Sequence, residues 1–103
     1  MSYCNKTDIE MKYIKENERI YTTNDGGKVI AEVTFPTKNG ISTIDHTFVD
    51  NSLRGQGIAG ELVRLAADTI LAEGNRIAAT CPYAITWFRQ HPEYPVVDND
   101  TQA

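Results

Sequence analysis

The stretch that decides the fold is Val49-Asp50-Asn51-Ser52-Leu53-Arg54-Gly55-Gln56-Gly57-Ile58-Ala59. It joins an alternating, strand-like segment to an amphipathic, helix-like one. Glycines in such a turn can adopt positive φ, and successive backbone N–H groups at a turn and at a helix N-terminus point in the same direction. The helix dipole adds partial positive charge at the same place. The stretch therefore predicts a cradle for a phosphate, with Arg54 as a cation beside it.

Two other phosphate-binding motifs do not fit this turn. A dinucleotide-binding fold needs GxGxxG after its first strand and an acidic residue about 20 positions later, whereas these glycines follow the fourth predicted strand. A Walker loop needs Gly-Lys-Ser/Thr, which the sequence lacks. A glycine turn that binds nothing is the alternative that the motif alone leaves open.

Size and composition are those of one globular domain. The chain has 103 residues, of which 41% are hydrophobic and 23% charged. This length supports a single core, so we expect one domain over residues 1–103 with its core at about 9–95. No apolar run reaches the length of about 18 residues that spans a membrane, and residues 1–6 lack the apolar stretch of a secretory signal. These features predict a cytoplasmic protein with no membrane partner.

Charge and cysteine content argue against further classes of protein. The net charge of −4 disfavours nucleic-acid binding, which needs a concentrated basic surface, and suits a cationic partner better. Cys4 and Cys81 are too few for a disulfide framework or a zinc site. We therefore expect free thiols, no metal and no nucleic-acid partner.

Hydrophobic periodicity predicts the order of the elements. Two-residue alternation indicates strands at about 9–13, 19–22, 29–35 and 41–49, joined by short turns and therefore antiparallel. Three- and four-residue spacing then indicates a helix over 58–73, which Gly74 and Asn75 end. A strand at 76–81 follows this helical crossover and should lie parallel to the fourth strand, and Pro82 starts a second helix to about residue 90. The predicted fold is α+β, with two helices on a mixed, mostly antiparallel sheet of about five strands.

The string Arg54-Gly55-Gln56-Gly57-Ile58-Ala59 resembles the Q/R-x-x-G-x-G/A signature of the GNAT superfamily of acetyl-CoA-dependent acetyltransferases. The order of strand, signature turn, helix, strand and short helix also fits that superfamily. With His46 before the signature, and Thr80-Cys81-Pro82-Tyr83 and Trp87-Phe88 after it, the chain resembles the minimal single-domain branch. The resemblance covers residues from about 10 to 94 and implies a GNAT-like fold.

The resemblance implies acetyl-CoA as cosubstrate. In the superfamily the backbone amides of the signature hold the CoA pyrophosphate, and the end of the preceding strand pairs with the pantetheine arm and directs an amide at the thioester carbonyl. The arm would then lie on Phe48 and Val49, and the pyrophosphate on Arg54, Gly55, Gln56, Gly57, Ile58 and Ala59. Larger relatives place one or two helices between the first two strands, for which this chain has no room. The amine-binding side should therefore be shallow, or be completed by another subunit or by the acceptor.

Three side chains are candidates for the chemistry. Cys81 closes the fifth predicted strand before a helix N-terminus, where the dipole can lower a thiol pKa, so it is a candidate nucleophile or proton donor, or else a buried core residue. His46, on the strand face predicted for Ile44 and Phe48, is a candidate general base or a structural histidine. Tyr83 is implied by the resemblance as the proton donor to the leaving sulfur, or else its ring packs in the core with the hydroxyl in solvent.

Together these observations predict an acetyl-CoA-dependent N-acetyltransferase that moves an acetyl group to a primary amine of a protein or small molecule. Direct attack in a ternary complex is the expected mechanism, and an acetyl intermediate on Cys81 is the alternative. The alternative function is an acyl-CoA-binding or protein-interaction module without turnover. We expect a monomer or a weak dimer.

Overall fold

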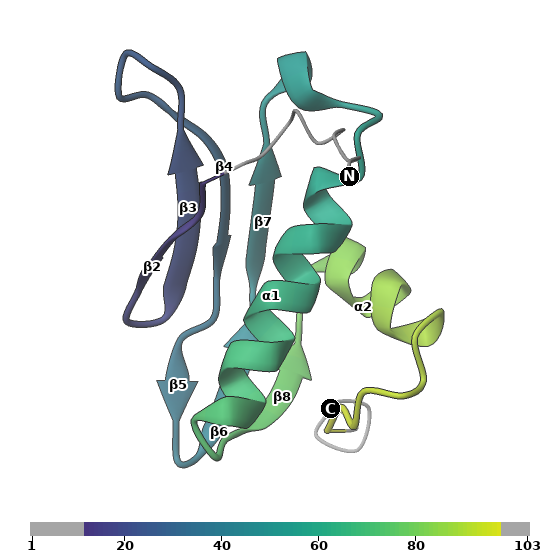
Figure 1. Ribbon diagram of the computed structural model, residues 1–103. Coiled ribbons are helices and arrows are strands. Elements are labelled where there is room, and N and C mark those ends of the chain that lie inside the picture. The colour runs from purple at the N-terminus through teal and green to yellow at the C-terminus, as the bar shows by residue number, and fades with distance from the viewer. Residues whose placement is uncertain (1–11, 98–103) are drawn as a thin grey trace, which may run out of the picture.

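The computed structural model describes residues 12–97 (Figure 1). Its strands are β2 (Ile14–Glu16), β3 (Arg19–Thr23), β4 (Val29–Thr34), β5 (Thr37–Lys38), β6 (Ile41–Ile44), β7 (His46–Val49) and β8 (Arg76–Ala79). Helix α1 spans Ile58–Ala72, helix α2 spans Pro82–Arg89, and a short 3-10 turn, η1, spans Asn51–Leu53. Of the strand predicted at 9–13, residues 9–11 lie outside the described residues, and Lys12 and Tyr13 precede β2. No helix within residues 12–97 has the length and apolar character needed to cross a bilayer.

The strands form two sheets. The first is antiparallel, in the order β2-β3-β4-β7, and the second has the order β5-β6-β8 with β6 parallel to β8. The α+β class, the two helices and the parallel pair linked through α1 are thereby confirmed. The single mixed sheet of the prediction is in fact divided in two.

The division falls at Asp45, so the prediction of one continuous strand over 41–49 is wrong. The Asp45 N–H donates to the Thr34 carbonyl at 3.2 Å, and its carboxylate accepts from Thr34 Oγ1 at 2.6 Å. A side-chain hydrogen bond of this kind competes with the regular strand ladder. On one side of Asp45, β6 pairs with β8, and on the other side β7 pairs with β4.

The interruption at Asp45 also changes which side chains face the core. Ile44 is fully buried, but in β7 the inward positions are Thr47 and Val49, which lie opposite the buried residues of β4. His46 and Phe48 point to the outer face of the sheet and are exposed. The simple alternation predicted that His46 shares a face of the strand with Ile44. The structure shows that it does not.

Two short strands were not predicted. β2 reaches β3 through a turn at Asn17 and Glu18, where Glu18 has φ +67°. β5 reaches β6 through Asn39 and Gly40, which have φ +56° and +80°. Two successive residues with positive φ are typical of the tight type I′ hairpin turn. The segment predicted as the turn 36–40 thus contains a hairpin of its own.

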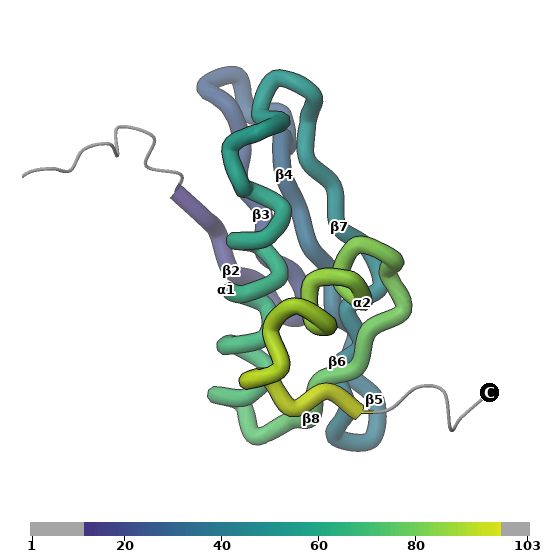
Figure 2. The backbone as a smooth tube through the Cα atoms, turned by 90° about the vertical axis from the view of Figure 1, so that its right-hand side faces the viewer, coloured from purple at the N-terminus to yellow at the C-terminus, as the bar shows by residue number. Residues whose placement is uncertain are grey.

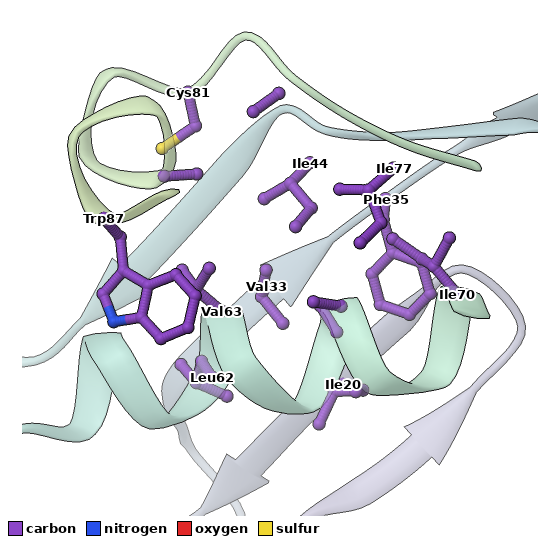
Figure 3. Close-up of a cluster of buried hydrophobic side chains, with 14 of the residues drawn as sticks. Ile20, Val33, Phe35, Ile44, Leu62, Val63, Ile70, Ile77, Cys81 and Trp87 are labelled. Carbon is purple, nitrogen blue, oxygen red and sulfur yellow. The ribbon is translucent and has the colours of Figure 1, made fainter. Parts of the chain in front are cut away.

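Helix α1 covers one face of the antiparallel sheet and also contacts β6 and β8, while α2 packs against α1 and β8 (Figures 1 and 2). Figure 3 shows Leu62, Val63 and Ile70 of α1 facing Ile20 and Val33 of the sheet, and all five are fully buried. Burial of such side chains is the main term that stabilises the fold. Because α1 contacts strands of both sheets, it holds the two sheets together.

Candidate functional site

The site is built on the connection from β7 to α1. After Val49 the chain makes the turn η1, which Asp50 caps: its Oδ2 accepts from the Ser52 N–H at 3.0 Å and from Ser52 Oγ at 2.6 Å. The side-chain hydrogen bond from Ser52, followed by the backbone one, lowers the pKa of Asp50 below its ordinary value. An ionised Asp50 thus fixes the start of the loop that leads to α1.

Two glycines give this loop its shape. Gly55 has φ +84° and Gly57, the N-cap of α1, has φ +74°, a region that other residues rarely adopt. A Cβ built on either glycine would meet no atom within 4 Å outside the adjacent residues. Glycine is therefore required for the backbone conformation, and there is open space beside the loop. A bound group can therefore come close to this backbone.

The N–H groups of residues 55–60 have no acceptor among the described residues. The first hydrogen bond of α1 runs from the Glu61 N–H to the Gly57 carbonyl at 3.1 Å, and no side chain caps the helix. The Arg54 N–H differs, because it donates to the Asn51 carbonyl at 3.1 Å. Of the predicted pyrophosphate-binding residues, Arg54 thus has its amide occupied, whereas Gly55, Gln56, Gly57, Ile58 and Ala59 present theirs.

The outer edge of β7 supplies a second row of main-chain groups. The Asp50 N–H donates to the Ile30 carbonyl at 2.8 Å, and the register pairs Glu32 with Phe48 and Ala31 with Val49. Since bonded and non-bonded pairs alternate in an antiparallel ladder, Phe48 directs its N–H and C=O toward β4.

Thr47 and Val49 occupy the alternate positions and direct their main-chain groups away from β4. Within residues 12–97 no strand pairs with that edge of β7. This register leaves the main-chain groups of Val49 and Thr47 available for pairing with an extended ligand. The sequence does not reveal the register, and for that reason Thr47 was not predicted at the site.

Loop and strand edge open into one pocket of about 430 Å³. The pocket extends along β7 and the first turn of α1 to α2, which contributes Tyr83. It brings together most of the predicted cofactor-binding residues with one of the three predicted catalytic residues. It is lined by Thr47, Val49, Leu53, Arg54, Gly55, Gly57, Ile58, Ala59 and Tyr83.

Cys81 lies behind the inner end of this pocket. It is the N-cap residue of α2, its N–H donates to the Ile44 carbonyl at 3.1 Å, and only 7% of its surface is exposed. Its Sγ donates to Thr47 Oγ1 at 3.5 Å, and Thr47 lines the pocket. Figure 3 shows Cys81 at the margin of the buried cluster, on the same side as Trp87.

Tyr83 is 44% exposed and stands at the pocket wall, next to the first turn of α1. A Cβ on Gly60 would lie 3.3 Å from the Tyr83 hydroxyl and 3.1 Å from Trp87 Nε1. Gly60 therefore allows α2 to approach α1 closely enough for Tyr83 to reach the pocket. This role of Gly60 was not predicted from the sequence, although a glycine inside a helix is the signal for such close packing.

The pocket lining does not include three of the predicted site residues, His46, Phe48 and Gln56. His46 Nε2 is 3.7 Å from Glu32 Oε1 on the outer face of the sheet, and Glu32 also pairs with Arg19. The Phe48 side chain is exposed on that same face, and the Gln56 side chain is exposed on the loop. The structure thus does not bring the His46 imidazole together with Cys81 and Tyr83.

A second hollow, of about 540 Å³, adjoins the loop on the side between α1 and α2 and shares Gly57 with the first. Its lining includes the exposed cation Arg64 and the indole of Trp87. Tyr13 Oη donates to Glu61 Oε1 at 3.0 Å at its border, and burial, together with this hydrogen bond, raises the pKa of Tyr13. Within residues 12–97 no three His, Cys, Asp or Glu side chains gather as metal ligands would.

Residues 19–97 match the sequence model of a family described as GCN5-related N-acetyl-transferase. The chain belongs to this family. The match includes the loop, both helices and every strand from β3 onward. No curated protein is similar enough in sequence to count as a match.

Solved structures agree with this family assignment. A proposed GCN5-like N-acetyltransferase from Staphylococcus aureus is 23% identical, with a TM-score of 0.70 over 84% of this chain and 88% of that chain. A proposed acetyltransferase from Agrobacterium tumefaciens is 25% identical, with a TM-score of 0.55 over 82% of this chain and 59% of that chain. The first likeness shows the fold of an acetyltransferase of this family at nearly the same chain length.

A GNAT family N-acetyltransferase from Escherichia coli, solved in complex with CoA, is 27% identical, with a TM-score of 0.50. The alignment covers 57% of this chain and 37% of that chain. The family match shows an N-acetyltransferase of the GNAT type, with acetyl transfer as its general activity.

Proposed function

We propose that this protein binds acetyl-CoA in the pocket between β7 and α2 and transfers the acetyl group directly to a primary amine. One observation carries the proposal: the pocket with the unpaired edge of β7 is also lined by Gly55, Gly57, Ile58 and Ala59, whose N–H groups have no acceptor among the described residues. These N–H groups suit a diphosphate, and the strand edge suits the amides of a pantetheine arm.

The N-terminus of α1 would hold the diphosphate. Hydrogen bonds from several backbone N–H groups and the positive end of the helix dipole favour an anion there without a lysine. Arg54 is one of the loop residues that line the pocket, and its guanidinium adds a positive charge there. Its amide contributes nothing, because that amide is bonded to Asn51.

The arm would extend from the loop along β7, toward Thr47. There an N–H of Val49 or Thr47 could donate to the thioester carbonyl oxygen, which becomes negatively charged as the amine attacks. A single donor of this kind is typically worth about 3 kcal/mol of transition-state stabilisation. Both amides face the open edge, which supports this role.

In the proposed reaction the amine nitrogen forms a bond to the carbonyl carbon, and the bond from that carbon to sulfur breaks. The cationic amine first gives one proton to solvent, and the neutral amine loses a second as it becomes an amide. The departing CoA thiolate gains one proton, so the products are an N-acetyl amine and free CoA thiol. Tyr83 is placed at the pocket wall and is the group best situated to protonate the sulfur. His46, on the outer face of the sheet, is less well situated for a step at the reacting atoms.

Direct attack is favoured over an acetyl intermediate on Cys81. The Cys81 side chain is almost fully buried, and its Sγ faces Thr47 Oγ1 without lining the pocket. Accumulation of acetylated protein in the absence of an amine would reveal the two-step route instead. The acceptor is proposed to be cationic when free, in keeping with the net charge of −4.

Binding can be tested by calorimetry with acetyl-CoA on Gly57→Glu and on a matched control, Gly27→Glu. Both glycines have positive φ, at +74° and +88°, and neither has an atom outside the adjacent residues within 4 Å of its Cβ position. The two variants therefore impose a similar backbone strain and the same charge. We expect Gly57→Glu to abolish binding and Gly27→Glu to retain it, whereas equal loss in both variants would count against the proposed site.

Turnover separates the enzyme from a binding module that keeps acetyl-CoA bound. Within the described residues no helix follows β2 or β3 to build a deep acceptor side, which is the observation that favours the module. Release of CoA thiol from acetyl-CoA that depends on an added amine would support the enzyme. Tight binding with no such release across lysine peptides, protein N-termini, polyamines and small amines would support the module.

A further inference from the structure

Thr47 of β7 and Cys81, the N-cap residue of α2, meet at the inner end of the pocket. On β7 the lining begins at Val49 beside the loop and ends at Thr47, and α2 contributes Tyr83. Directly behind Thr47 lies Cys81, with its Sγ 3.5 Å from Thr47 Oγ1. Thr47 belongs to β7 and Cys81 follows β8, so this contact joins the two sheets at the end of the pocket lining.

Behind this contact the molecule is solid. Val33, the cross-strand partner of Thr47, is fully buried, as are Ile44 below the contact and Ala84 in the first turn of α2. The Cys81 side chain is nearly inaccessible and is absent from the pocket lining. A group that enters along β7 therefore meets Thr47, with Cys81 packed behind it, as a floor, and close-packed core lies beyond.

We propose that Thr47 and Cys81 restrict the transferred acyl group to the length of acetyl. This inference rests on the proposed function, since it requires the arm to extend from the loop toward Thr47. The acyl group of the thioester then lies at the Thr47 end, where acetyl fits against the floor. The two further methylene groups of butyryl have to displace Thr47 or Cys81 from packed positions.

The restriction acts through volume, so it can be separated from the hydrogen bond. Thr47→Val keeps the branched shape and loses the hydroxyl, whereas Thr47→Ala removes both groups beyond Cβ. Cys81→Ala opens the same floor from the other side and provides a second, independent variant. Because the readout is the affinity for the thioester, it does not depend on a role of Cys81 in the chemistry.

The experiment is calorimetric titration of CoA, acetyl-CoA and butyryl-CoA into the wild type and the three variants. For the wild type we expect butyryl-CoA to bind at least about 10-fold more weakly than acetyl-CoA, as excess methylene groups usually cost in a closed pocket. Thr47→Ala and Cys81→Ala should bring the two affinities to within about threefold, while Thr47→Val keeps the wild-type ratio. Free CoA, which has no acyl group, should bind all four proteins alike.

Equal binding of acetyl-CoA and butyryl-CoA by the wild type would overturn the proposed floor, and it would leave the proposed acetyl-CoA site intact because both ligands bind. A preference for acetyl-CoA that survives both alanine variants would overturn the assignment to Thr47 and Cys81. Absence of binding for CoA and both thioesters would overturn the proposed function and the floor together.

Discussion

Cys81 Sγ and Thr47 Oγ1 are 3.5 Å apart across the point where the two sheets separate. Cys81 follows β8, which is parallel to β6, while Thr47 belongs to β7, which is paired with β4. The Ile44 carbonyl accepts from the N–H groups of both Thr80 and Cys81, which ends the parallel ladder at this level. Beyond it β7 has an open edge, and the pocket begins there.

Tyr83→Phe should lower the rate of acetyl transfer and leave acetyl-CoA affinity nearly unchanged. The substitution removes only the hydroxyl proposed to protonate the leaving sulfur, and a general acid usually contributes about 100-fold or more to the rate. The measurement is kcat and KM with an amine acceptor, once one is found. Tyr21→Phe on β3, at the far face of the sheet, is the control and should behave as wild type. An unchanged kcat for Tyr83→Phe would remove Tyr83 from the mechanism.

Gly60→Ala should destabilise the fold although alanine is the better helix former. The added methyl would lie 3.1 Å from Trp87 Nε1. The Trp87 ring is held in place by stacking on His91, with ring centroids 3.7 Å apart, and by an edge contact with Phe88, with ring centroids 5.3 Å apart. The gain in helix propensity is about 1 kcal/mol and overpacking costs about 1 to 3 kcal/mol, so we expect a net loss of about 1 kcal/mol.

Urea denaturation of Gly60→Ala measures this loss in the free energy of unfolding. The double variant with Trp87→Phe is the internal control, because a smaller ring should relieve the crowding and give a favourable coupling energy. A Gly60→Ala protein more stable than wild type would show that α2 is free to move aside.

Leu62→Ala should cost about 2 to 5 kcal/mol of unfolding free energy, because Leu62 is fully buried between α1 and the sheet. Leu71→Ala in the same helix is the matched control, since Leu71 is 40% exposed, and it should change stability by about 0.5 kcal/mol or less. Chemical denaturation compares the two. Similar losses would contradict the observed orientation of α1.

The order of the turn η1 should depend on pH through Asp50. Its pKa is lowered by the two hydrogen bonds from Ser52, so the folded turn favours the ionised form. The stabilisation is therefore fully present above the ordinary aspartate pKa of 3.8 and is lost as the pH falls through the lower, folded-state value. The Ser52 amide resonance should accordingly titrate with a midpoint below 3.8.

Ser52→Ala removes the side-chain donor and should move the Asp50 midpoint back toward the ordinary value. The NMR signal to follow is then the amide of residue 52 in the variant. A wild-type midpoint at or above that of the variant would rule out the hydrogen bond as the cause.

The features of the fold that depend on residues close together along the chain were predicted from the sequence. Leu62, Ala66 and Ile70 recur at helical spacing and are all buried, and Gly57 starts α1 in the conformation that the glycine turn indicated. These features follow from local propensity and periodicity. Val49 and Ile58, which the family resemblance had assigned to the cofactor, line the pocket, and their binding role remains a prediction.

The remaining features depend on contacts between distant residues. Nothing local in residues 41–49 shows that Asp45 forms a hydrogen bond with Thr34 and interrupts the strand. For this reason the strand face predicted for His46 was wrong, and Thr47 was not predicted at the site. Gly60 likewise matters only because Trp87 and Tyr83 pack against it. Such tertiary contacts override strand and helix propensity.

The most direct test of the central claim is an NMR titration of the wild type with CoA and, separately, with pantetheine, which has no diphosphate. We expect CoA to shift the amide resonances of residues 55–60 together with those of Thr47 and Val49. Pantetheine should shift Thr47 and Val49 and leave residues 55–60 in place. If CoA leaves the 55–60 amide resonances unmoved at saturation, or if pantetheine moves them as far as CoA does, the diphosphate does not bind at this loop.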